Sequence, residues 1–210
     1  QSEMAAPLRT PTVIASDDGM KQATQKALAM FIGTPLEPYL PAQITIDNVA
    51  VGSIGGDEDY YGQLISADQQ ADGSIYSHIE LTDRYRTGGH FNPKEMQLSL
   101  GNVGISLTEA EIMAAYTQDP AVGALGHEIF HGIVKHKVNG VVVTTEPFTS
   151  FQKIFYVGNG DAPAVTRYAN SYDGPTRQYE DFSDVMVLYR LAPSLLQSLS
   201  PEKYNFAQQL

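Results

Sequence analysis

The residues most able to do chemistry in this chain are His127, Glu128 and His131, which form the pattern H-E-x-x-H. Residues four apart on a helix lie one turn apart on the same face, so both imidazoles can reach one metal ion at about 2.0 to 2.1 Å. Glu128 is rotated by about 100° from His127 and can reach a metal-activated water without becoming a ligand. The pattern predicts zinc-assisted hydrolysis with Glu128 as the general base.

The alternative is that these three residues fell together by chance on a structural helix. In a chain with 5 histidines, a bare spacing match would arise in roughly one sequence in a hundred or fewer. Ile129 and Ile133 turn the same helix toward a core, and polar groups beside that face are costly unless something binds them. We therefore interpret the pattern as a metal site.

A catalytic zinc needs a third protein ligand and one open position. The chain contains no cysteine, so the third ligand must be a histidine or a carboxylate. His136 lies nine residues after His127. The H-E-x-x-H-x-x-G-x-x-H pattern of the metzincins requires ten and a glycine that is missing here, so His136 is disfavoured.

Two carboxylates further along the chain are stronger candidates. Glu180 and Asp184 lie one helical turn apart, on a stripe that apolar residues continue at Val187, Leu188 and Leu191. An uncompensated buried pair of like charges is strongly unfavourable, so the stripe predicts a bound cation. We expect Glu180 to coordinate zinc and Asp184 to accept a hydrogen bond from a ligand histidine. Asp181, rotated by about 100° from Glu180, should face elsewhere and leave zinc affinity little changed when it is replaced by Asn.

The His127 motif together with Glu180-x-x-Ser183-Asp184 resembles the gluzincin branch of zinc peptidases, of which thermolysin is the best-known member. The separation between His131 and Glu180 is more similar to that in lethal factor and the Pro-Pro endopeptidases. The resemblance covers roughly residues 123–191. It implies a zincin-like catalytic domain that holds one Zn²⁺ ion and hydrolyses a peptide or protein substrate.

A tyrosine precedes the expected glutamate ligand. Tyr168-Ala169 is similar to the Tyr-Ala or Tyr-Ser segment that lies before the glutamate helix in lethal factor and the Pro-Pro endopeptidases. We expect Tyr168 to donate a hydrogen bond to the oxyanion of the tetrahedral intermediate. Tyr168 lies twelve residues before Glu180, which is longer than the family spacing, and Tyr172 remains an alternative.

Composition restricts the partners. A formal net charge of -11 with only 13 basic residues disfavours nucleic acid, which needs clustered cations. No stretch approaches the roughly 18 apolar residues that span a bilayer, so we expect no membrane contact. The polar, Pro- and Ala-rich start of the chain is what removal of a signal peptide would leave, and we expect a secreted or periplasmic protein. The sequence carries no signal for an oligomeric state.

The elements that must position these residues follow from periodicity. Before the motif we expect a helix at Asp17–Phe31 and strands at 43–51, 60–66, 75–82 and 96–105. Helices follow at 109–116 and from Pro120 to about Lys137, the second carrying the motif and stopped by Asn139-Gly140. A strand at 141–145, an irregular stretch at 147–176 and a helix at 180–191 complete the prediction.

These elements predict one α+β domain of the zincin-like type, with a mixed sheet and the motif helix in residues 1–138. A mainly helical part in residues 139–210 supplies the third ligand, and the active-site cleft lies between the two. The substrate would pair as an added strand with a sheet edge, for which we favour 96–105. Residues 1–95 have no assigned role, and cleavage specificity is not readable.

Two other functions fit the same residues. One is a zincin-fold binding module without catalysis, against which the intact Glu128 argues, and the other is a zinc hydrolase of a non-peptide amide. His78 and His90 are single histidines without a partner motif, which we interpret as surface or hydrogen-bonded residues. The acidic turns at 57–59 and 68–73 lack the ligand alternation of an EF-hand, and the sequence leaves calcium binding open.

Overall fold

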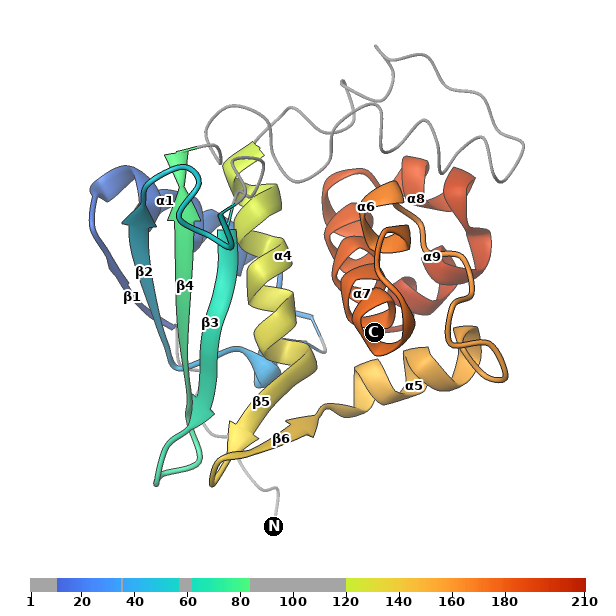
Figure 1. Cartoon of the computed structure of the whole chain (residues 1–210), viewed down its shortest axis with the longest axis horizontal. Coiled ribbons are helices and arrows are strands. Elements are labelled where there is room, and N and C mark those ends of the chain that lie inside the picture. The colour runs from blue at the N-terminus through green and yellow to red at the C-terminus, as the bar shows by residue number, and fades with distance from the viewer. Residues whose placement is uncertain (1–10, 35, 57–61, 84–119) are drawn as a thin grey trace.

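The computed structural model describes residues 11–34, 36–56, 62–83 and 120–210. The strand predicted at 96–105 and the helix predicted at 109–116 lie outside these ranges. Within them, a mixed sheet, two α-helices and a short 3-10 helix, Glu37–Tyr39, form one part of the molecule, and a group of helices forms the other (Figure 1).

The sheet has the strand order β1-β2-β4-β3-β5-β6. Its strands are β1 Thr12–Ala15, β2 Gln43–Val49, β3 Gly62–Gln69, β4 Ile75–Thr82, β5 Lys135–Val138 and β6 Val141–Thr144. The β1–β2, β2–β4 and β3–β5 pairs are parallel, and the β3–β4 and β5–β6 pairs are antiparallel. The strands predicted at 43–51 and 75–82 are confirmed, and β3 extends three residues beyond its predicted end at Ser66.

Alternation along β4 separates a core face from an outer face, as a half-buried strand requires. Ile79 and Leu81 are fully buried, while Tyr76 on the other face is exposed. Thr82, which alternation alone would place on the outer face with Tyr76, is buried instead. Both α-helices of this part pack on the buried face of the sheet.

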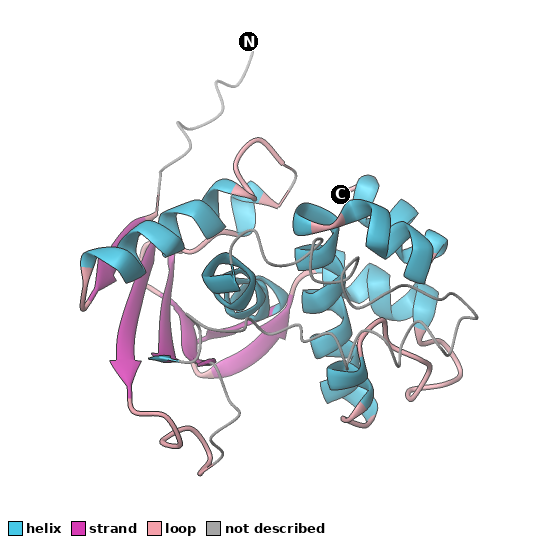
Figure 2. Cartoon of the chain, turned by 90° about the horizontal axis from the view of Figure 1, so that it is seen from above, coloured by secondary structure: helices cyan, strands magenta, loops and turns pink. Residues whose placement is uncertain are grey.

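Helix α1, Asp18–Ala29, begins where predicted. The carboxylate of Asp17 accepts a hydrogen bond from the Met20 amide at 2.7 Å, which caps the first turn. Met20 and Ala27 are fully buried. Helix α4, Pro120–Val134, packs against both α1 and β3, so the two helices lie side by side on the sheet (Figure 2).

The motif helix α4 ends at Val134, not at about Lys137, and the prediction for residues 135–137 is wrong. These residues begin β5, which pairs with β6 across a two-residue turn at Asn139 (φ 51°) and Gly140 (φ 78°). Two positive φ angles are the geometry of a type I′ hairpin turn, which Asn-Gly favours. Asn139-Gly140 is therefore a hairpin turn and not a helix stop, and the sheet continues to Thr144.

Five helices follow the sheet: α5 Glu146–Phe155, α6 Arg167–Asn170, α7 Gly174–Leu191, α8 Pro193–Leu199 and α9 Pro201–Gln208. Residues 147–176, predicted to be mostly irregular, thus contain most of α5, α6 and the start of α7, and the prediction holds only for 156–166 and 171–173. Helix α7 begins six residues before the predicted start at Glu180. Phe148 and Phe151 of α5 pack edge-on against Phe182 of α7, at ring-centroid distances of 5.7 and 5.3 Å. This aromatic contact fixes α5 beneath α7.

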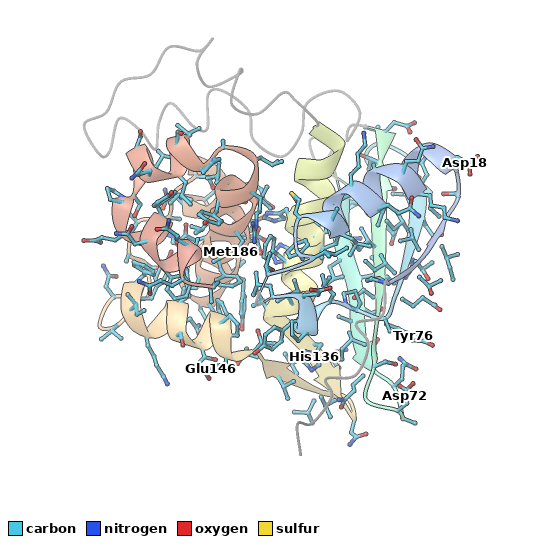
Figure 3. The ribbon with its side chains drawn as sticks, turned by 180° about the vertical axis from the view of Figure 1, so that it is seen from behind. Asp18, Asp72, Tyr76, His136, Glu146 and Met186 are labelled. Carbon is cyan, nitrogen blue, oxygen red and sulfur yellow. The ribbon has the colours of Figure 1, made fainter. Side chains whose placement is uncertain are left out.

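Helix α4 lies between the sheet and α7, and one continuous apolar core joins both parts of the molecule. A Cβ added at Gly132 would lie 3.3 Å from the Ser77 hydroxyl oxygen, so the glycine permits close contact with the sheet. Seen from behind, Met186 of α7 points inward among the helices, whereas Asp18 and Asp72 lie at the outer ends of the sheet part (Figure 3). None of the described helices has the length and apolarity needed to cross a bilayer.

Candidate metal centre

Helix α4 presents the motif residues His127, Glu128 and His131 toward α7. The two imidazole rings meet edge to face with centroids 4.5 Å apart. His127 is 1% exposed, and the side chain of His131 is 14% exposed. Each of the three residues offers one potential ligand atom, and these three atoms lie within 4.8 Å of one another. The four-residue spacing therefore produces the convergence expected from helix geometry.

Helix α7 adds the carboxylate of Glu180 to this group. Its Oε2 lies 2.8 Å from Nε2 of His127 and 3.3 Å from Nε2 of His131. Glu128 and Glu180 both lie beside the histidines. Among the described ion pairs, Glu180 is the carboxylate that contacts both imidazole rings. Glu180 is thus the candidate third ligand, and Glu128 is left facing the cleft.

The charges in this cluster are strongly coupled. Burial disfavours ionisation of Glu180, yet His131 and His127 hold the pKa of its carboxyl well below the usual range. Burial likewise favours the neutral imidazole of His127, but the carboxylates of Glu180 and Asp184 raise its pKa well above the ordinary value. Two carboxylates thus demand a positive charge at His127, and either a proton or a metal cation supplies it.

Asp184 determines which nitrogen of His127 is available. Its Oδ1 lies 2.8 Å from Nδ1 of His127, and both side chains are almost fully buried. A proton on Nδ1 serves this contact and leaves the lone pair of Nε2 facing Oε2 of Glu180. Two acceptor atoms at 2.8 Å repel unless a cation lies between them, and a divalent metal meets that need.

The dimensions and donor types of the cluster fit zinc. Ligand bonds of 2.0 to 2.2 Å in a tetrahedron place neighbouring ligand atoms about 3.3 to 3.6 Å apart. The 3.3 Å between His131 and Glu180 matches this spacing. The 2.8 Å between His127 and Glu180 is shorter and would open by about half an ångström. Two imidazole nitrogens and one carboxylate oxygen are also the ligand set of many catalytic zinc sites.

A further layer of hydrogen bonds holds the supporting groups. The hydroxyl of Thr166 donates to Oδ2 of Asp184 at 2.5 Å and accepts from the Ala169 amide at 3.0 Å. The hydroxyl of Ser183 lies 3.4 Å from Nδ1 of His131. Thr166 was not identified from the sequence, because it comes from an irregular segment with no periodicity to indicate its direction.

Tyr168 and Tyr172 both reach the site. Their hydroxyls lie 3.1 Å apart, and the Tyr168 ring meets the His127 ring edge-on with centroids 6.2 Å apart. Burial and the nearby Glu180 carboxylate raise the pKa of Tyr168 above its ordinary value, so its hydroxyl keeps its proton at neutral pH. A neutral hydroxyl can donate to a developing oxyanion. Helix α6 and the turn after it bring both tyrosines to Glu180, so the twelve-residue spacing is no obstacle.

A cleft of about 360 Å³ opens beside these groups. Gly62, Gln63 and Leu64 of β3 line one side, and Tyr172, Tyr179 and Glu180 line the other. His131 and Glu128 of α4 also line it. The cleft thus lies between the sheet part and the helical part.

Asp181 faces away from the candidate metal ligands, as its rotation on α7 predicts. It is fully buried, however, and accepts hydrogen bonds from the Tyr156 hydroxyl at 2.7 Å and the Val165 amide at 2.8 Å. Its Oδ2 also lies 2.6 Å from the Lys203 ammonium. Replacing Asp181 would disturb folding, so it is unsuitable as the silent control that the sequence indicated.

The remaining histidines and acidic turns lie elsewhere. Nε2 of His78 lies 2.6 Å from the Asp47 carboxylate on the outer sheet surface, while His90 falls outside the described residues. The Asp72 carboxylate accepts from the amide and hydroxyl of Ser74, which accounts for it as a turn residue. Residues 57–59 are outside the described ranges.

Comparison of the chain with protein-family models, with curated proteins and with solved structures finds no match in any of the three. The function must therefore be argued from the site itself.

Proposed function

We propose that this chain is a zinc-dependent endopeptidase of the gluzincin type. The observation that carries the proposal is the convergence of Oε2 of Glu180 on Nε2 of both His127 and His131, at 2.8 and 3.3 Å. The three ligand atoms come from two helices distant in sequence and form a set suited to one divalent cation with an open side. The adjoining cleft, lined by Glu128, offers room for a substrate.

His127, His131 and Glu180 would hold the zinc, which when bound polarises a carbonyl and lowers the pKa of water. Glu128 accepts a proton from the attacking water, whose oxygen bonds to the carbonyl carbon. It then returns the proton to the amine nitrogen as the carbon–nitrogen bond breaks. Tyr168 or Tyr172 donates a hydrogen bond to the carbonyl oxygen as negative charge develops there.

Strand β3 is a suitable guide for an extended peptide. Its first residues, Gly62 to Leu64, line the cleft. One edge of β3 pairs with β4. Along its other edge, β3 pairs with β5 at Asp68 among the described residues. The cleft end of β3 thus offers backbone groups to which an added strand could bond. The edge predicted at 96–105 lies outside the described residues, so β3 carries this part of the proposal.

The test combines metal analysis with cleavage of a mixed peptide library. We expect about one zinc per chain, and cleavage that stops with a chelator and returns with zinc. Glu128→Gln should retain zinc and lose about 10²- to 10⁴-fold in turnover, because only the proton acceptor is removed.

The possible outcomes separate the candidate functions. Bound zinc without cleavage of any peptide would favour a binding module, or a hydrolase of other amides if non-peptide substrates are turned over. Near-normal turnover by Glu128→Gln would contradict the assigned base. Equal zinc content in wild type and His127→Ala would show that the metal site itself is wrong.

A further inference from the structure

Lys135 brings a positive charge into the candidate cleft. It lies four residues after His131 and is the first residue of β5, directly beyond the end of α4. Its partly buried side chain lines the cleft together with His131 and Glu180. The function proposed above assigns no role to this lysine.

The Lys135 ammonium is held against an aromatic ring. Its Nζ lies 4.3 Å from the ring centroid of Tyr179, which itself packs on Phe148 with centroids 4.7 Å apart. A cation over an aromatic face is attracted by the negative face of the ring. The contact crosses from β5 to α7 and restrains the amine beside the candidate ligand Glu180.

Lys135 makes no ion pair with a carboxylate in the part of the chain that the structure describes. Lys203 provides the contrast, because its buried ammonium lies 2.6 Å from Asp181. The buried Lys203 thus has a carboxylate partner, which Lys135 lacks among the described residues. Lys135 has an aromatic support and an open cleft instead.

Lys135 could instead serve to balance the carboxylates of Glu128 and Glu180, which line the same cleft. A divalent cation bound there would offset the charges of Glu180 and of Asp184, which contacts His127. Glu128 keeps its negative charge but forms no ion pair with Lys135 among the described residues, so the Lys135 ammonium can still meet a ligand in the cleft. In a chain of net charge -11, a local positive site distinguishes ligands by the sign of their charge.

We propose that Lys135 is a specificity-determining residue that binds a carboxylate of the substrate, so that the preferred substrates are acidic peptides. The proposal rests on the peptidase function proposed above. The carboxylate comes either from an Asp or Glu side chain near the scissile bond or from the α-carboxylate of a peptide ending in the cleft. Thr176 and Gln63 line the same cleft and offer further hydrogen-bond donors.

The test uses the zinc-loaded protein and amidated peptides that differ only in Glu, Gln or Lys at one position near the cleaved bond. We expect kcat/KM for the best Glu peptide to exceed that of its Gln partner about tenfold or more. Lys135→Met should reduce this ratio to about one, and Lys135→Glu should reverse the charge preference in favour of the Lys peptide. Lys135→Arg should keep the preference.

A second comparison identifies the source of the carboxylate. Faster cleavage of peptides with a free C-terminus than of their amides would identify the α-carboxylate as the group that Lys135 binds.

Lys137→Met is the matched control, because Lys137 is exposed on the same strand and the same charge is lost. An equal Glu-to-Gln ratio in wild type and Lys135→Met, or an equal loss in Lys137→Met, would overturn the proposal. If the wild type cleaves no peptide, the proposed function fails. Calorimetric binding of the Glu and Gln peptides then decides the role of Lys135 alone, and equal affinities would reject it.

Discussion

Among single residues, Asp184 has the most specific supporting role, because it holds Nδ1 of His127. We predict that Asp184→Asn weakens zinc affinity by roughly 10- to 100-fold, since an amide no longer fixes the ring as firmly or balances its charge. Thr166→Val should weaken it less, because the Thr166 hydroxyl bonds to Asp184 and is thus one step further from His127. Competition with a chromophoric chelator measures both effects.

Asp173→Asn is the control for that experiment. It removes the same charge from the N-cap position of α7, where the side chain is 92% exposed. Its zinc affinity should equal that of the wild type. A loss in Asp173→Asn as large as in Asp184→Asn would attribute the effect to net charge and not to the contact with His127.

The two tyrosines give a second prediction at this scale. Tyr168→Phe should lower kcat by about 10²- to 10³-fold with zinc retained, because one oxyanion donor is lost. Tyr172→Phe should have a smaller effect, since its hydroxyl meets that of Tyr168, and the Tyr168 ring packs edge-on against His127. Steady-state kinetics of both variants, each checked for zinc content, decide the matter. Unchanged kcat in both would reject a tyrosine donor.

The sequence predicted the residues of the site whose direction follows from helical periodicity. His127 with His131, and Glu180 with Asp184, each lie one turn apart, so a helix alone determines their common face. Thr166 and Lys135 could not be found in this way. Their directions depend on the loop before α6 and on the end of α4, which only tertiary packing determines.

At the scale of elements, the regular parts of the fold were predictable and the transitions were not. Strand β4 follows from alternation and α1 from its Asp17 cap. The end of α4 was missed because Val134 to Val138 satisfies both a helical and a strand pattern, and pairing with β6 decides between them. Helix α5 did carry a signal, in Pro147 and the spaced phenylalanines after it, which the irregular composition of the following segment obscured.

The ion pair between Asp181 and Lys203 connects α7 to α9 and gives a prediction for the helical part. Both side chains are buried, with Tyr156 as a further partner of the carboxylate. Lys203→Met leaves Asp181 without its counter-charge, and we expect it to lower the free energy of unfolding by about 3 to 5 kcal/mol. Urea denaturation of the metal-free protein measures this without any contribution from zinc.

The double variant Asp181→Asn with Lys203→Met tests the cause of that loss. The asparagine oxygen can still accept from Tyr156 or Val165, and no buried charge remains, so part of the stability should return. Lys153→Met on the exposed face of α5 serves as the control and should change little. A double variant as unstable as the sum of the two single variants would show that the charges act independently.

In the whole molecule, the candidate metal centre lies where the sheet part meets the helical part. His127 and His131 belong to α4, which packs on the sheet. Glu180 belongs to α7, which packs against the other helices of the helical part. The apolar core already joins the parts through contacts of α4 with α7. A metal ion bound at this junction would add a cross-link that neither part can make alone.

The last prediction follows from this position. A ligand that binds only the folded state stabilises it by RT ln(1 + [L]/Kd), which is about 4 kcal/mol at a thousandfold excess over Kd. For a chain of this size, each kcal/mol raises Tm by about 2 to 4 °C. Chelation should therefore lower Tm by about 8 to 16 °C, and zinc should restore it. In calorimetry, Glu128→Gln should show the full shift because it keeps all three ligands, whereas Glu180→Gln should show little of it because the ligand that joins the two parts is weakened. A full shift in Glu180→Gln would mean that zinc binds the folded chain without bridging α4 and α7, and the third ligand assigned here would be wrong.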